Sequence, residues 1–156
     1  MAKNGKVDVK GLENFRKNIE KSLGSNQINE FIESCAKELA ARLLAKVIKR
    51  TPVGQYPKSS GKKGGTLRRG WTGEKSQSAS TYAQGLKVHH FGGVYVIEII
   101  NPVKYAPYVE FGHRTRGGDG WVEGKFMLTI SEQELERDAP KILENKLKKK
   151  LGECFK

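Results

Sequence analysis

The chain has 156 residues, enough for one domain with a sizeable hydrophobic core. Its 29 lysines and arginines outnumber its 17 acidic residues by 12, which favours a negatively charged partner such as nucleic acid or an acidic protein surface. Two cysteines, Cys35 and Cys154, are too few for a disulfide framework and indicate a reducing compartment. We expect no signal peptide and no membrane partner, because the N-terminus leads into no apolar segment and the longest apolar run, residues 94–100, is far short of the roughly 20 residues of a membrane span.

Two amphipathic helices are predicted in the first third of the chain. The first covers residues 11–23, after a short extended piece at 7–9. The second, over residues 27–50, is the clearest element, with apolar side chains at helical spacing: Ile28, Phe31, Ile32, Cys35, Leu39, Leu43 and Val47. Ser25 or Asn26 can cap its start, and Thr51 ends it because a residue before proline avoids the α conformation.

Residues 51–66 form a polar loop with two prolines, four glycines and three lysines. This composition cannot bury apolar area, so we expect a mobile surface loop. A phosphate-binding loop requires a glycine, four residues and then Gly-Lys-Ser/Thr, and this pattern is absent. The glycines therefore do not predict a nucleotide site.

Strands are predicted between residues 66 and 100. Residues 66–72 are the first candidate, although Leu67 to Arg69 also fits a helical turn. Residues 85–91 alternate apolar and polar side chains, and residues 94–100 are rich in β-branched side chains. Gly92-Gly93 between them is typical of a hairpin turn, and Asn101-Pro102 ends the second strand.

Residues 105–111 are the most informative segment. They combine three aromatic rings, those of Tyr105, Tyr108 and Phe111, with a carboxylate, Glu110, in apolar surroundings. A short helix is predicted, with a proline in its first turn and Gly112 after its end. Dense aromatic motifs without nucleophiles or metal ligands more often hold a fold or an interface than perform chemistry.

The C-terminal part contains a second glycine-rich loop at residues 114–120, which we also expect to be mobile. Residues 121–127 are predicted to return as a short strand. Ser131 to Glu134 match a capping box and predict a helix start. The inward side chains of that helix would be Leu135, Ala139, Ile142, Leu143, Leu147 and Leu151. Pro140 would kink or split it.

Catalytic and metal-binding patterns are weak. His89 and His90 would point to opposite faces of a strand, and no cysteine or acid stands at ligand spacing beside them or His113. We therefore predict no metal, no cofactor and no enzymatic activity. Burial could raise the pKa of a carboxyl toward the general-acid range, so Glu98 and Glu110 could form a catalytic pair. We prefer a structural interpretation, in which one faces solvent or a strand partner and the other pairs with an arginine such as Arg68, Arg69 or Arg114.

A basic run has two interpretations. It comprises Lys58, Lys62, Lys63, Arg68 and Arg69, with Tyr56 and Trp71 nearby. A basic loop with aromatic side chains can bind a nucleic-acid backbone. Alternatively, the loop is solvated and its arginines bond a neighbouring subunit. We prefer the second interpretation, because lysines are spread along the chain from Lys3 to Lys156.

The order of short motifs resembles a known family. A long helix ends in Thr51-Pro52-Val53, a glycine-bearing loop leads to Leu67-Arg68-Arg69, and two strands end at Asn101-Pro102 before Tyr-Ala-Pro-Tyr-Val-Glu-Phe-Gly. This order resembles the small neck and tail-completion proteins of tailed double-stranded DNA phages, defective prophages and phage-tail-like bacteriocins. The resemblance covers roughly residues 7–150. The chain departs from the family pattern in its longer loop at 54–66 and in His113, where the family has threonine.

The resemblance implies a non-enzymatic α+β subunit with one domain over residues 1–156, in which a small antiparallel sheet packs against a long N-terminal helix and a C-terminal helix. It also implies a ring of about six copies at the head-proximal end of a tail, where the ring ends the tail and joins it to the neck or collar. Its partners would be other copies, tail-tube and sheath subunits, and neck or head-connector proteins. The particle would be a virion or phage-like tail assembled in the bacterial cytoplasm.

The interface residues that we predict on this basis are Tyr105, Tyr108, Glu110, Phe111, Arg68, Arg69 and Trp71. The alternative function is a basic nucleic-acid-binding module, and a toxin or nuclease is third.

Overall fold

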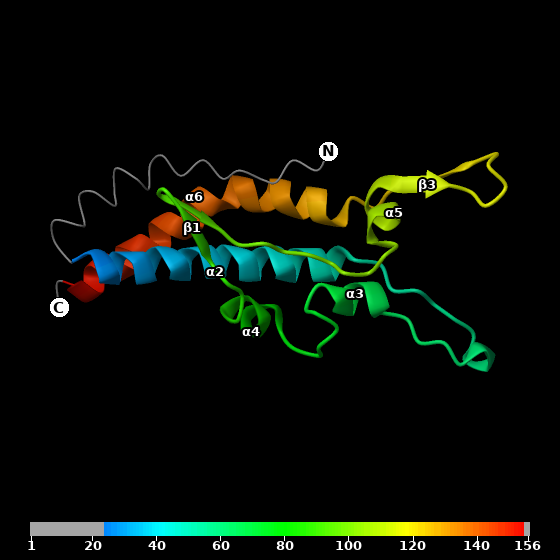
Figure 1. Ribbon diagram of the computed structural model, residues 1–156, viewed down its shortest axis with the longest axis horizontal. Helices are drawn as coiled ribbons and strands as arrows, with labels where there is room; N and C mark the ends of the chain where they lie inside the picture. The colour runs from blue at the N-terminus through cyan, green and yellow to red at the C-terminus, as the bar shows by residue number, and fades with distance from the viewer. Residues whose placement is uncertain (1–23, 155–156) are drawn as a thin grey trace.

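The structure is a computed structural model, and it describes residues 24–154. Two long helices, α2 (Ser25–Arg50) and α6 (Met127–Cys154), lie side by side and run in opposite directions along the molecule (Figure 1). The short elements between them in the chain lie against α2 and at the end of the pair where α2 ends and α6 begins. The predicted extended piece at 7–9 and the predicted helix at 11–23 lie outside the described residues.

Helix α2 confirms the helix predicted over residues 27–50. Its buried side chains recur at helical spacing on one face: Ile28, Ile32, Cys35, Ala40, Leu44 and Val47. The predicted cap is wrong, because Gly24 precedes the helix and no side chain caps its start. Thr51 ends the helix as predicted, and both its backbone N–H and its hydroxyl donate to the carbonyl oxygen of Val47.

The β-structure consists of two separate two-stranded antiparallel sheets. Strand β1 (His89–Phe91) pairs with β2 (Val94–Val96), and β3 (Gly112–Arg114) pairs with β4 (Trp121–Glu123). The α+β class and the hairpin turn at Gly92-Gly93 are confirmed, whereas one continuous sheet is not formed. The mobility of the glycine-rich loops stays a prediction.

Strands β1 and β2 are shorter than the predicted strands at 85–91 and 94–100. The chain before β1 belongs to the end of a helix: the backbone N–H groups of Gly85 and Leu86 donate to the carbonyls of Tyr82 and Ala83. Residues 97–100 consequently lack the antiparallel neighbour that a longer hairpin would give them.

Two short helices occupy positions where the sequence suggested other structure. Helix α3 (Thr66–Gly70) stands where a strand was the first prediction, so that prediction is wrong and the helical-turn alternative is right. Helix α4 (Ala79–Gln84) was not predicted. The hydroxyl of Ser78 caps it by accepting from the N–H of Thr81 at 3.1 Å. Six residues with one buried side chain, Ala83, are too few to show a helical period.

Helix α6 begins at Met127, four residues before the predicted capping box, so that prediction is wrong. Ser131 lies inside the helix, where its hydroxyl donates to the carbonyl of Met127 and accepts from Arg50 at 2.8 Å. The helix is not split at Pro140, which is exposed. Leu135 and Ala139 face inward as predicted, and the four later apolar positions are partly buried.

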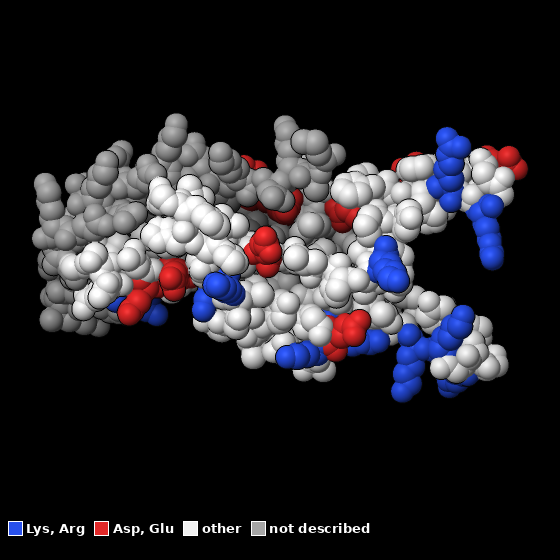
Figure 2. Space-filling view, in the orientation of Figure 1, with Lys and Arg blue, Asp and Glu red and all other residues white. Residues whose placement is uncertain are grey.

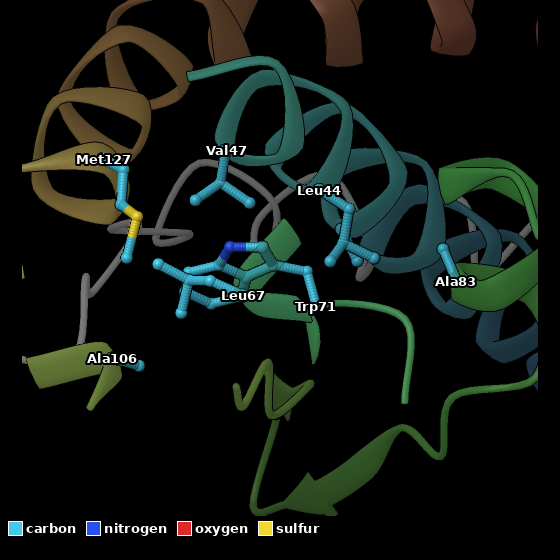
Figure 3. Close-up of a cluster of buried hydrophobic side chains, with 8 residues drawn as sticks. Leu44, Val47, Leu67, Trp71, Ala83, Ala106 and Met127 are labelled. Carbon is cyan, nitrogen blue, oxygen red and sulfur yellow. The ribbon is translucent and has the colours of Figure 1, made fainter. Parts of the chain in front are cut away.

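The main hydrophobic core lies where the end of α2 meets α3 and the start of α6. Figure 3 shows side chains from α2, α3, α4, α5 (Ala106–Phe111) and α6 converging on it. Its buried members are Ala40, Leu44, Val47, Leu67, Trp71, Ala83, Ala106 and Met127. A second cluster joins the other ends of the long helices to β2, through Ile28 and Ile32 with Tyr95, Leu147 and Leu151. The short helices are thus held because each places a few apolar side chains in a shared core.

Ion pairs fix α2 against α6. The Glu134 carboxylate lies 2.7 Å from Arg50 and 3.1 Å from Lys46, and Lys146 lies 2.9 Å from Glu38. The hydrogen bond from Lys146 is the main cause that lowers the pKa of Glu38, and the bonds from Lys46 and Arg50 lower the pKa of Glu134. Glu132 behaves oppositely, because burial raises its pKa.

These shifts predict a loss of stability in acid. A carboxylate whose pKa is lowered by folding stabilises the protein above its ordinary pKa, and this contribution disappears as pH falls through the lowered value. Lys146→Met should therefore destabilise the protein at neutral pH by less than about 1 kcal/mol and reduce the fall in stability between about pH 5 and pH 2. Urea unfolding at several pH values measures both effects. Lys149→Met, at an exposed position without an ion pair to any described residue, is the control and should change neither.

Candidate assembly interface

Glu110 holds the start of α6. Its side chain is 6% exposed, and its carboxylate accepts from the backbone N–H groups of Leu128 and Thr129, both at 2.9 Å, and from the Thr129 hydroxyl at 2.7 Å. The first N–H groups of a helix have no partner within it, and the positive end of the helix dipole favours a negative charge. The predicted pairing of Glu110 with an arginine is therefore wrong. Glu98, the other candidate carboxylate, is exposed, as predicted for one of the two.

Backbone contacts join α5, the β3–β4 hairpin and α6 at this cap. The N–H groups of Lys125 and Phe126 donate to the carbonyls of Val109 and Glu110 at 2.7 and 3.0 Å. A Cβ atom on Gly124 would lie 2.3 Å from the Glu110 carbonyl oxygen, so only glycine allows this approach. Gly112, which follows α5 as predicted, has φ of 88°, a conformation that favours glycine.

The arginines of the Leu-Arg-Arg motif bind backbone carbonyls. The guanidinium of Arg68 donates from Nη2 and Nε to the carbonyl of Thr51 at 2.8 and 3.3 Å, which fixes α3 to the end of α2. Exposed Arg69 donates to the carbonyl of Gly64 in the preceding loop at 3.3 Å. In the single subunit, both arginines therefore hold the loop that connects α2 to α3. Their contact with a neighbouring subunit stays a prediction.

Trp71 lies in the core and is 3% exposed. Its indole Nε1–H donates to the Thr51 hydroxyl at 2.8 Å, and that hydroxyl in turn donates to the carbonyl of Val47. Trp71 therefore shapes the subunit from inside, and a contact with a partner stays a prediction.

Trp71→Phe should lower the free energy of unfolding by about 1–3 kcal/mol, because the buried Thr51 hydroxyl loses its donor and a small void opens. Thermal and urea unfolding measure the change. Trp121→Phe, which alters a tryptophan that is 55% exposed, is the matched control and should have little effect on unfolding.

The aromatic side chains of the α5 motif point away from the subunit. Tyr105, Tyr108 and Phe111 are 47%, 59% and 52% exposed, whereas Ala106 and Glu110 on the other side of the helix are buried. Tyr108 meets the His113 ring edge-on, with ring centres 6.1 Å apart. Large exposed aromatic groups beside one another are typical of interaction surfaces.

Sequence reasoning missed further exposed apolar side chains on β4 and near the start of α6. They are Trp121, Val122, Phe126 and Ile130. The β3–β4 hairpin is a separate two-stranded sheet, so side chains on both of its faces can be exposed. The alternation of side chains along a strand tells which face each one is on, but not whether that face is covered. We call Tyr105, Tyr108, Phe111, Trp121 and Phe126 together the aromatic surface.

A hollow of about 270 Å³ lies beside the aromatic surface, between α5 and the loop at residues 52–66. Tyr105 and Val109 line it from the α5 side, and Val53, Tyr56 and Lys63 line it from the loop side. The loop and the aromatic surface are therefore neighbours in space. A partner that contacts the aromatic surface could therefore also contact this loop.

Other functional sites find little support in residues 24–154. This part of the chain contains no cluster of histidine, cysteine and acidic side chains that could hold a metal ion. Cys35 is buried, and burial raises the pKa of its thiol to about 11. Within these residues, no helix has the length and apolar character that crossing a bilayer requires.

Comparison with known proteins identifies the family. Residues 13–112 match the family described as "Bacteriophage HK97-gp10, putative tail-component". The chain belongs to this HK97-gp10-like family. No curated protein and no solved structure matches the chain significantly. The resemblance to phage neck and tail-completion proteins is thereby confirmed, and it indicates a structural, virion-associated tail component that contacts other tail proteins.

The motifs of this HK97-gp10-like chain mostly build the fold. Asn101 donates from its amide to the carbonyl of Leu67 at 2.8 Å and accepts from the N–H of Val103 at 3.1 Å. Like Arg68 and Glu110, it binds backbone groups of a different segment. The aromatic side chains of Tyr105, Tyr108 and Phe111 are instead about half exposed, which leaves much of their surface available to a partner.

Proposed function

We propose that this HK97-gp10-like protein assembles as a ring of about six copies at the head-proximal end of a phage or phage-like tail, ends the tail there and joins it to the neck or collar. The observation that carries the proposal is the aromatic surface, which lies beside the Glu110 cap and is exposed in the single subunit. Other copies, the tail tube or sheath, and the head connector would be its partners.

Two separate exposed apolar regions on the subunit support a closed ring. In a head-to-tail ring each copy offers two different surfaces, one to each neighbour. Figure 1 shows α5 and β3 at one end of the subunit and β1 nearer the other end. The β1–β2 hairpin carries its own exposed apolar side chains, Phe91, Val94 and Val96. The subunit thus has two separate apolar regions, as a heterologous contact requires.

The first test is the mass of the purified protein by light scattering, with negative-stain images of the same sample. Closed rings of about six subunits are the expected result. A monomer at every concentration would contradict the self-assembling ring.

The aromatic surface is tested by the double variant Tyr108→Ser with Phe111→Ser. We expect it to stay monomeric, because each buried aromatic anchor commonly contributes about 2 kcal/mol or more to an interface. The control variant Lys141→Ser with Lys149→Ser changes two exposed positions on α6 and should still form rings. Rings in both variants, with equal melting temperatures, would exclude the aromatic surface as the interface.

A further inference from the structure

Two loops project from the end of the subunit that bears the aromatic surface (Figure 1). The first, residues 52–65, connects α2 to α3 and contains the short helix η1 (Lys58–Ser60). The second, residues 115–120, connects β3 to β4. Figure 2 shows lysine and arginine side chains at the outer parts of both loops.

The outer parts of the loops consist of basic, small and hydroxyl-bearing residues. Residues 58–65 contain only lysine, serine and glycine, and residues 114–120 contain arginine, threonine, glycine and one acid, Asp119. The five cations of this region, called the loop cations below, are all exposed: Lys58, Lys62 and Lys63 in the first loop, Arg116 in the second, and Arg114 at the end of β3. Lys62 lies over the Tyr56 ring, with its Nζ 5.9 Å from the ring centre. The outer parts of both loops thus carry positive charge and no apolar side chain.

These cations differ from several of those on the long helices, which form ion pairs with acidic side chains. On α2 and α6, lysines and arginines pair with Glu38, Glu134 and Glu144. No acidic side chain within residues 24–154 forms an ion pair with any of the five loop cations. Part of the positive charge of the chain is therefore concentrated at one end of the subunit, where no acidic side chain of the described residues forms an ion pair with it.

The chemistry of the loops favours phosphate over a protein surface. Protein interfaces have apolar centres and are depleted in lysine, whereas Lys58 to Gly65 offers no apolar side chain. Phosphate groups are bound by lysine and arginine, by serine and threonine hydroxyls, and by backbone N–H groups, which are the groups that these loops present. We propose that the two loops bind the phosphate backbone of double-stranded DNA.

The binding would not depend on base sequence. Reading bases in the major groove requires a helix or a two-stranded ribbon that enters it. The helix η1 has three residues and each strand of the β3–β4 ribbon has three, so we assign the loops to phosphate contacts and not to base reading. Binding driven by phosphate contacts releases counterions and weakens steeply with salt. This interaction goes beyond the proposed tail function and holds for the single subunit, whereas a ring would strengthen it by presenting several copies of each loop.

The test is the affinity of the full-length protein for a short fluorescent DNA duplex, measured by anisotropy over a series of salt concentrations. The variant Lys58→Gln, Lys62→Gln, Lys63→Gln should weaken binding at low salt at least about tenfold and make the salt slope shallower by about 2–3, since each phosphate contact contributes about 0.9. Arg114→Gln with Arg116→Gln should make it shallower by about 1–2.

The matched control is Lys141→Gln, Lys148→Gln, Lys149→Gln, which removes equal charge from α6 and should leave the slope unchanged. An equal effect of the control would show that only net charge matters and would overturn the proposal. So would no salt-dependent DNA binding by the unaltered protein, or binding to polyglutamate in place of DNA. Light scattering on the same variants separates this outcome from ring formation, because the loop substitutions should not change the mass of the particle.

Discussion

Replacing Glu110 with alanine should lower the free energy of unfolding by about 2–4 kcal/mol, since a buried cap with three hydrogen bonds is lost. The N–H groups of Leu128 and Thr129 would be left without their acceptor at the start of α6. For a chain of this length the melting temperature should fall by about 4–15 °C. Urea and thermal unfolding measure the loss, and light scattering should show fewer rings, because the cap also positions α5.

Two further variants isolate the cause of that loss. Glu98→Ala removes an exposed carboxylate and should leave stability almost unchanged. Glu110→Gln keeps the shape of the side chain but loses the negative charge and one acceptor, so its effect should lie between those of Glu110→Ala and the original protein. If Glu110→Ala and Glu98→Ala had equal melting temperatures and formed rings equally well, Glu110 would not act as a stabilising cap.

Gly124→Ala should also lower the free energy of unfolding, by about 1–3 kcal/mol. The added methyl group would meet the carbonyl oxygen of Glu110 at 2.3 Å and the backbone around Phe111 at 2.7 Å. Because these are backbone atoms, they cannot move aside without breaking the bonds that Lys125 and Phe126 make to α5. Unfolding measurements give the size of the effect, and amide hydrogen exchange should show faster exchange at residues 125 and 126.

The control for this substitution is Gly117→Ala in the loop between β3 and β4. A methyl group there would meet only the Asp119 carboxylate, at an ordinary distance of 3.8 Å. Gly117→Ala should therefore be neutral in stability. If the two alanine variants were equally stable, the close approach of α5 to the hairpin would not be a constraint on the fold.

Local patterns predicted several elements correctly. Helix α2 follows from apolar side chains at helical spacing, and its end follows from the proline after Thr51. The β1–β2 turn follows from two glycines, and α5 with its terminal Gly112 follows from a proline and a glycine at opposite ends. These features depend on neighbours in the chain, so the sequence contains the information directly.

Predictions failed where distant residues supply the decisive contacts. The capping-box pattern predicts a helix start at Ser131, but α6 begins at Met127 and its cap comes from Glu110, 18 residues before Leu128. Likewise, residues 66–72 were first expected as a strand, but Leu67 and Trp71, one helical turn apart, both join the core against α2. The spacing of residues within either segment carries no information about these distant contacts.

The sequence by itself determined the family, through the order of its motifs, and with it the structural role in a phage tail. Only the tertiary structure decided which motif residues face inward, because burial depends on what lies opposite each side chain. It places Trp71 and Glu110 inside the subunit and leaves Tyr105, Tyr108 and Phe111 exposed. It also decided which cations are paired: Arg50 and Lys146 meet acids far away in the chain, whereas the five cations of the projecting loops form no ion pair with a described residue.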